Sequence, residues 1–352
     1  MKTQNLLYAF LLAAMATVGC EKGDRSYSLL SDAKSFNQSV VYTPRKIDIL
    51  WVVDNSGSMS SSQAQLAQSF PAFINRMQAL NFDYRMAVTT TDAWAGQFNG
   101  NQTLFRVRDG VGSSHSGVFI MTPTTPNLSN VFNINVTQGT LGNGDERAFQ
   151  SMRNVLSYAG NSDFRRTGSH LAVIVVSDED DFSSNSSTYL NNNYSSPNLL
   201  PVSQFITYMN GLAGANDLAN GVHNWSFNTV AILDTACRNA LNASFSGRIV
   251  GQRYIQLSNA SGGAKTSLCD DFGSNLQLIQ DTILSASSVF QLDREPIPST
   301  IRVTVDGQSV VENSTNGWSY NATSNQVAFH GSAIPNAGAS VLISFDPAAP
   351  KN

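Results

Sequence analysis

Two runs of strongly apolar, β-favouring residues constrain the fold of this chain more than any other feature. Residues 47–53 (IDILWVV) and 171–176 (LAVIVV) are almost continuously apolar, without the alternation of a strand that has one face in water. Strands of this kind are buried on both faces, as in a parallel sheet covered by helices. Each run ends in a polar sequence, DNSGS or SDEDD. Both strands are therefore expected to deliver polar loops to one edge of a sheet.

The rest of the central sequence alternates between helix-like and strand-like segments. Helices are expected over residues 61–80, with a kink at Pro71, and over 145–158, 202–212 and 272–286. Further strands are expected over residues 84–90, 227–233 and 253–257. This alternation predicts an α/β fold with a doubly wound, mostly parallel sheet flanked by helices.

The two ends of the chain differ from this central domain, which is predicted to span residues 46–292. Residues 1–19 have the charged start and apolar stretch of a signal peptide, and residues 20–45 are polar and aperiodic, as in a tether. Short alternating strands are expected over residues 301–305, 318–320, 326–329 and 341–345. Residues 296–348 are therefore predicted to form a small, β-sandwich-like domain.

The residues before Cys20 (TVG) resemble the cleavage sequence of bacterial lipoproteins, in which the cysteine becomes an acylated N-terminus. No later segment has 18 consecutive apolar residues, so membrane attachment is expected through lipid alone. An ordinary signal peptide with an incidental cysteine is the alternative. The resemblance implies a lipid-anchored protein of the bacterial cell envelope, on the outer membrane and either periplasmic or surface-exposed.

The remaining cysteines and the charge balance fit an exported protein. Charged residues make up only 13% of the chain, the formal net charge is −4, and basic residues do not cluster, which argues against nucleic acid as a partner. If Cys20 is acylated, Cys237 and Cys269 remain as a pair in an oxidising compartment. We expect them to form a disulfide; two buried free thiols are the alternative.

The loop after the first apolar run has the residues of a cation site. Asp54, Ser56 and Ser58 alternate, so their side chains can converge, and Gly57 permits a tight turn. Carboxylate and hydroxyl oxygens suit a hard cation, which predicts Mg²⁺, with Mn²⁺ or Ca²⁺ as alternatives. The competing interpretation is a helix cap formed by residues 60–62.

With this motif between a strand and a helix, residues 45 to about 292 resemble the von Willebrand factor A and integrin I-domain family. The resemblance implies a metal-ion-dependent adhesion site that also takes a threonine from a later loop and an aspartate after a later strand. Thr140, in the sequence GTLGNG, and Asp178, directly after LAVIVV, match those two positions. In that family the hydroxyls bind the metal, the carboxylates often act through water, and a partner's acidic group completes the coordination.

The sequence therefore predicts a protein that is not an enzyme and that binds a protein or other macromolecular ligand through its cation. Residues 94–136 and 182–200, which are long loops, would set the specificity. The alternatives are a non-catalytic assembly or scaffold component of an envelope complex and the metal-site subunit of an enzyme system. No His pair has metal-ligand spacing and no Gly-x-Ser-x-Gly elbow is present. Asp180 and Asp181 are either solvated acidic residues or a second ion site.

Overall fold

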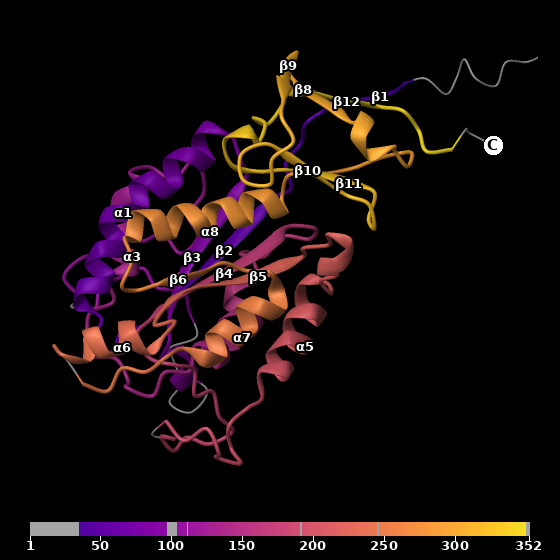
Figure 1. Cartoon of the computed structure of the whole chain (residues 1–352). Helices are drawn as coiled ribbons and strands as arrows, with labels where there is room; N and C mark the ends of the chain where they lie inside the picture. Colours follow the sequence, from indigo (N-terminus) through magenta and orange to yellow (C-terminus); the bar gives the residue numbers. More distant parts are fainter. Residues whose placement is uncertain (1–34, 97–103, 111, 191, 245, 350–352) are drawn as a thin grey trace, which may run out of the picture.

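The computed structural model describes residues 35–96, 104–110, 112–190, 192–244 and 246–349. Its centre is a parallel sheet of five strands in the order β3-β2-β4-β5-β6 (Figure 1). The strands are β2 (Ile47–Val53), β3 (Tyr84–Thr90), β4 (His170–Ser177), β5 (Trp225–Ala231) and β6 (Lys265–Ser267). The predicted signal peptide and Cys20 lie outside the described residues.

Helices cover both faces of this sheet, because alternate residues of its central strands are apolar on both sides. From β2, Ile49, Trp51 and Val53 face one core, while Leu50 and Val52 face the other. The first core is closed by α1 (Ser60–Ala79), α3 (Leu128–Val136) and α8 (Phe272–Ala286). The second is closed by α4 (Ala148–Ser157), α5 (Val202–Ala213) and α7 (Gln252–Ser261). Figure 1 shows α1 and α8 on one side of the sheet and α5 and α7 on the other.

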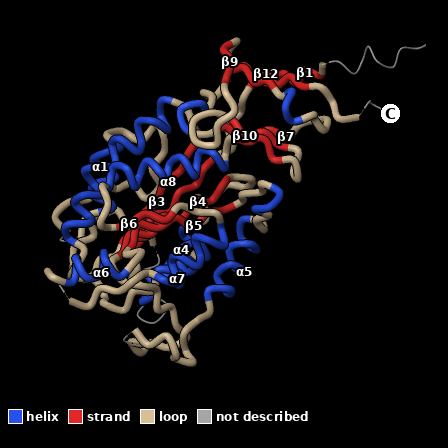
Figure 2. Tube along the Cα trace, in the orientation of Figure 1, coloured by secondary structure: helices blue, strands red, loops and turns tan. Residues whose placement is uncertain are grey.

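Two antiparallel sheets pack at the amino-terminal edge of the parallel sheet (Figure 2). One has the order β1-β12-β8-β9 and contains β1 (Phe36–Val41), β12 (Ser340–Phe345), β8 (Arg302–Val305) and β9 (Gln308–Val310). The other has the order β10-β11-β7 and contains β10 (Trp318–Asn321), β11 (Gln326–Phe329) and β7 (Val289–Gln291). A hydrogen bond of 2.7 Å between the Tyr42 and Ser288 hydroxyls links the segment before β2 to the segment after α8.

The predicted fold class is wrong for the chain as a whole. A doubly wound, mostly parallel sheet with a separate C-terminal β domain does not describe it, because a four-stranded and a three-stranded antiparallel sheet accompany the five parallel strands. These sheets also draw on other parts of the chain. Strand β1 comes from the predicted tether and pairs with β12, and β7 comes from residues assigned to the main domain. The polar edge strand β1 (FNQSVV) is mostly exposed, so no apolar pattern reveals it.

Several elements also differ from their predictions. The predicted strand over residues 253–257 is part of helix α7, in which Tyr254 and Leu257 are buried one turn apart. The predicted helix over residues 145–158 starts only at Ala148. Helix α1 matches its prediction within one residue at each end and contains Pro71. The loop predicted over residues 94–136 contains α3, and the short helix α6 (Thr235–Asn242) was not anticipated.

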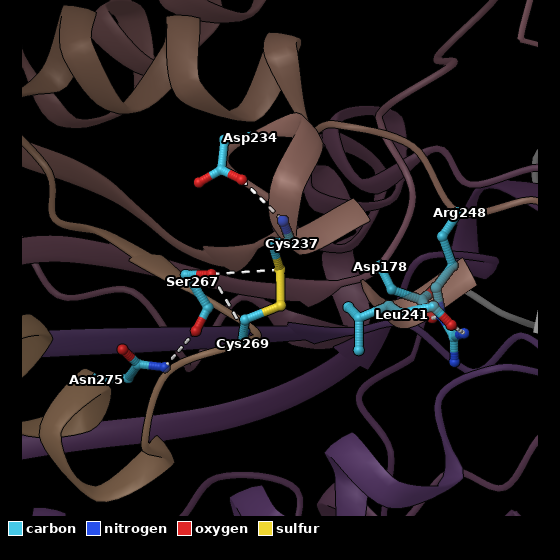
Figure 3. The surroundings of a disulfide bond; sticks show 8 residues. All are labelled: Asp178, Asp234, Cys237, Leu241, Arg248, Ser267, Cys269 and Asn275. Carbon is cyan, nitrogen blue, oxygen red and sulfur yellow. Dashed lines mark hydrogen bonds and ion pairs between the residues drawn. A yellow bond between two sulfur atoms is a disulfide. The ribbon is translucent and has the colours of Figure 1, made fainter. Parts of the chain in front are cut away.

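Cys237 in α6 and Cys269 in the loop before α8 form the predicted disulfide (Figure 3). The Asp234 carboxylate caps α6 by accepting a hydrogen bond from the Cys237 N–H at 2.8 Å. The bond thus ties a short, mostly exposed helix to the segment that leads from β6 into α8. Cys237 is the one buried side chain of α6, so the disulfide is the main tie between this helix and the rest of the domain.

We expect replacement of Cys237 and Cys269 by serine to lower the free energy of unfolding by about 3–4 kcal/mol, because the bond closes a loop of 32 residues in the unfolded chain. Urea denaturation of the variant beside the oxidised wild type measures this. Reduction of the wild-type protein should reproduce the loss. Equal stability of the oxidised protein and the variant would show that the bond contributes nothing.

Candidate metal site

The register of three neighbouring strands brings the loops that contain the predicted site residues to the same level of the sheet. Strand β2 lies between β3 and β4, and Val53 is level with Thr90 on one side and Val176 on the other. Two further backbone hydrogen bonds continue this register past the strand ends: Thr91 N–H to Val53 O at 3.1 Å and Asp54 N–H to Val176 O at 3.0 Å. The loops that follow the three strands therefore start side by side at the carboxyl edge of the sheet.

Four of the five predicted site residues meet at this edge. Asp54 is completely buried, and its carboxylate accepts hydrogen bonds from the Ser56 N–H at 2.8 Å and the Ser177 hydroxyl at 2.6 Å. The Ser56 and Ser58 hydroxyl oxygens are 3.3 Å apart. The Ser58 hydroxyl donates to Asp178 at 2.8 Å. Two carboxylates and two hydroxyls thus converge, as the alternation of the motif predicts.

Thr140 is brought near this group, but its side chain does not join it. The Gln63 amide on α1 donates to the carbonyls of Asp54 at 2.8 Å and Gly139 at 2.9 Å, which binds the two loops together. The Gly142 N–H donates to the Asn55 carbonyl at 2.8 Å. A Cβ atom at position 142 would lie only 2.4 Å from the Asn55 side chain, so this approach requires glycine. Among the described residues, the half-buried Thr140 hydroxyl makes no hydrogen bond to the other four predicted ligands.

Arg248 is a site residue that the sequence did not reveal. Its guanidinium donates to Asp178 at 2.5 Å and to the Ser58 carbonyl at 3.3 Å, and a third hydrogen bond reaches the Leu241 carbonyl at 2.6 Å. Figure 3 shows Arg248 directed toward Asp178, beside the disulfide. This ion pair fixes Asp178 and offsets its charge. Arg248 lies 70 residues after Asp178 in an irregular segment, where no local pattern marks it.

Two other acidic residues of this edge, Asp180 and Asp181, have structural partners. Asp181 forms an ion pair with Arg253 at 3.1 Å and accepts the Phe149 N–H at 2.9 Å. Asp180 accepts hydrogen bonds from the Tyr194 hydroxyl at 2.8 Å and from the Arg253 N–H at 3.1 Å. The predicted alternative of a second ion at these residues lacks the free oxygen atoms that coordination needs.

The remaining carboxyl groups of this edge repel one another. Burial, together with the charge of Asp178, raises the pKa of Asp54 from 3.8 to about 7. Burial and the charges of Asp54 and Asp178 raise the pKa of Glu179 to about 8. Glu146, which precedes α4, is buried, and the charge of Asp54 adds to the burial that raises its pKa well above the usual range. The site thus has more negative charge than its own cationic groups neutralise.

The donor set fits a hard divalent cation, because all of its free atoms are carboxylate and hydroxyl oxygens. Within the residues that the structure describes, no three His, Cys, Asp or Glu side chains are grouped closely enough to hold a metal ion between them. Hydroxyl groups and water would therefore supply part of the coordination. Mg²⁺ matches this requirement because it retains several of its waters in protein sites.

No protein-family model matches the chain, and no curated protein matches it. Solved structures with a similar arrangement include the open conformation of the pilus adhesin SpaC from Lactobacillus rhamnosus GG, at 11% identity and a TM-score of 0.46 over 88% of this chain and 40% of that one. The pilus adhesin RrgA from Streptococcus pneumoniae is similar at 10% identity and a TM-score of 0.33, over 88% and 58% of the two chains. Proximal thread matrix protein 1 from the mussel byssus is similar at 11% identity and a TM-score of 0.34, over 70% of this chain and 47% of that one.

The chain spans less than two thirds of the length of each of these proteins. Similarity at this level identifies neither a family nor a function, and the site has to be judged on its own geometry.

The raised pKa of Asp54 contributes to the pH dependence of the metal-free protein. Since the folded state binds this proton more tightly than the unfolded state, stability should fall as the pH rises from about 4 to about 7. We expect Asp54→Asn to flatten this decline and to raise stability at pH 8. Urea denaturation in EDTA at pH 5 and pH 8 measures both effects, with the exposed Asp163→Asn as control. An unchanged slope in Asp54→Asn would contradict the assignment.

Proposed function

We propose that this chain is a non-enzymatic, divalent-cation-dependent binding protein of the cell envelope. Mg²⁺, or Mn²⁺ or Ca²⁺ in its place, is held by the Ser56 and Ser58 hydroxyls, with Asp54 and Asp178 orienting and neutralising it and Thr140 approaching from the next loop. The proposal thus assigns to these residues a metal-ion-dependent adhesion site, the type of site that their motif resembles. The convergence of Asp54, Ser56, Ser58 and Asp178 at one buried edge is the observation that supports it.

The partner's contribution follows from the charges of the site. The charge of Asp178 is partly neutralised by its ion pair with Arg248, and two of the proposed direct ligands are neutral hydroxyls. A cation bound in this way keeps much of its positive charge and takes up a further anionic oxygen readily. A carboxylate on a protein or other macromolecular partner is the matching group, and cation and partner then bind cooperatively.

The surface beside the site supports a macromolecular partner. An open groove of about 560 Å³ is lined by Asn55 and Gly142 together with residues of the 104–119 segment. Leu141, Phe119 and Leu104 stand along this groove and are 91%, 44% and 41% exposed. Exposed apolar side chains gathered beside a polar site are typical of protein-binding surfaces. The groove belongs to the loop region that the sequence predicts to set specificity.

The histidine with the most strongly shifted pKa lies away from the site. His170 begins β4, whereas Asp178 follows its far end, so the length of the strand separates them. Its ring contacts the His223 carbonyl and the Ser226 hydroxyl at 3.0 Å each, and burial lowers its pKa to about 3. His170 therefore stabilises the sheet as a neutral side chain. The proposed activity is binding alone.

Replacement of the metal ligands tests the proposal directly. We expect Asp54→Ala and Ser56→Ala to weaken Mg²⁺ binding at least about tenfold in calorimetry, because each removes a group that the cation needs. Ser61→Ala, in the exposed first turn of α1, is the matched control and should bind as the wild type does. Thermal unfolding in EDTA should remain close to wild type for Ser56→Ala and Ser61→Ala, and should be no lower for Asp54→Ala, which removes an uncompensated buried charge.

If both site variants bind Mg²⁺ as tightly as the wild type does, the proposal that these residues bind the metal is wrong. Unfolding of both variants in EDTA would instead show that these residues only hold the fold together, and the binding function would lose its support.

Attachment to the membrane is a separate part of the proposal and rests on the sequence around Cys20. None of the described helices is both long and apolar enough to cross a membrane. We expect the wild-type protein in the membrane fraction and Cys20→Ser in the soluble fraction, because acyl chains provide the anchor. Fractionation with mass spectrometry of the N-terminus measures this. A soluble wild-type protein with an unmodified N-terminus would contradict it.

A further inference from the structure

Glu146 is a buried acid without a partner. Only 1% of its surface is exposed, and neither carboxylate oxygen makes a hydrogen bond or an ion pair with a described residue. The Thr91 hydroxyl lies near enough to oppose the rise in its pKa, yet it makes no hydrogen bond of normal geometry and is itself without a partner. Buried carboxyl groups in this state are rare, because desolvation without compensation is costly.

The backbone on both sides of Glu146 is firmly held. The neighbouring Asp145 and Arg147 side chains form a buried ion pair with each other. The Arg147 guanidinium lies 4.0 Å from the centre of the Trp94 ring, and the Trp94 indole N–H donates to the Asp145 carbonyl at 3.1 Å. The Glu146 carbonyl accepts the Phe182 N–H at 2.7 Å. These contacts fix the Glu146 backbone in advance of any ligand.

Backbone contacts place the Glu146 segment beside the loops of the carboxyl edge. The Arg147 N–H donates to the Thr91 carbonyl at 3.3 Å, which places this segment against the loop after β3. Thr91 in turn stands beside Asp54 in the row that the strand register creates. The charge of Asp54 adds to burial in raising the pKa of Glu146 above its usual range. The backbone contacts thus bring Glu146 to the same edge of the sheet as Asp54.

Three carboxyl groups of this edge, those of Asp54, Glu146 and Glu179, have no ion pair with a described residue, and only Asp54 and Glu146 are fully buried. Asp178 is paired with Arg248, Asp145 with Arg147, and Asp181 with Arg253. Asp54 and Glu146 form none of the ion pairs found among the described residues. When both are ionised, these two buried groups carry a charge of about −2, which one divalent cation would neutralise.

We propose that Glu146 is an additional residue of the cation site, whose carboxylate accepts hydrogen bonds from water bound to the cation. The water-mediated form follows because the carboxylates of this edge are not close enough to enclose an ion directly, while Mg²⁺ keeps several waters whose hydrogens need acceptors. Glu146 thereby orients those waters and adds the negative charge that two neutral hydroxyls do not supply. This inference rests on the proposed function.

A purely structural acid would be built differently. A carboxyl group that stays protonated inside a protein normally donates a hydrogen bond to a carbonyl or carboxylate, and neither oxygen of Glu146 has such a contact among the described residues. Asp180, at the same edge, shows the structural pattern, with hydrogen bonds to both of its oxygens. The two acids differ in their hydrogen bonds: both oxygens of Asp180 accept hydrogen bonds from the protein, whereas those of Glu146 remain available to a ligand.

Glu146→Gln tests the inference because it keeps the shape and removes the charge. The full-length protein and this variant are titrated with MgCl₂ in a calorimeter, and their thermal unfolding is followed in EDTA and in Mg²⁺. We expect Mg²⁺ affinity to fall about 10- to 100-fold, the usual effect of losing a group that orients a metal's ligands. The melting temperature in EDTA should be no lower than that of the wild type, since the uncompensated charge is gone. Thr140→Ala serves as comparison and should have the smaller effect.

Each other outcome overturns a definite statement. If the wild type binds Mg²⁺ and Glu146→Gln binds it equally well, the inference is wrong and the proposed function stands. If the wild type binds neither Mg²⁺ nor Mn²⁺, both are wrong. If Glu146→Gln melts well below the wild type in EDTA, Glu146 is a structural residue and the inference is wrong.

Discussion

The desolvation of Asp54 is the constraint on which the carboxyl edge of this protein depends. Parallel pairing on both sides of β2 puts this residue between two neighbouring loops, where its carboxylate is completely buried and receives only neutral hydrogen-bond donors. A buried charge without a counter-charge is strongly destabilising. The fold meets this problem for Asp178 with Arg248 and for Asp181 with Arg253, but leaves it open for Asp54 and Glu146. A divalent cation at the proposed site would resolve it for both at once.

The two edges of the parallel sheet carry different structures. The antiparallel sheets join at the amino-terminal edge, where β1 pairs with β12 and the chain then enters β2 (Figure 2). The acidic loops lie at the opposite edge, after β2, β3 and β4. If the chain is anchored before β1, the binding edge points away from the anchor. The rigid strands between the edges keep the loops in register, so the ligand groups are positioned before a cation or a partner arrives.

The sequence predicted Asp54, Ser56 and Ser58 from their alternation after an apolar run, and Asp178 from the family resemblance of its place after a second run. These loops meet because the carboxyl ends of parallel strands lie at one edge of a sheet. Arg248 and Glu146 were not predictable in this way. Arg248 reaches the site from an irregular segment, and Glu146 precedes an ordinary amphipathic helix, where an acidic residue is expected for dipole reasons. The fold class was wrong because β1 has no apolar alternation, and the five residues 253–257 fit a strand or a helix equally well.

Anomalous diffraction from crystals grown with Mn²⁺ tests the central claim most directly, because it locates the ion without reference to activity. The account predicts one strong anomalous peak at the carboxyl edge, within coordination distance of the Ser56 and Ser58 hydroxyls, with a bound water between the ion and the Glu146 carboxylate. A well-ordered structure at saturating Mn²⁺ with no peak at this edge, or with Glu146 hydrogen-bonded to protein groups alone, would contradict it.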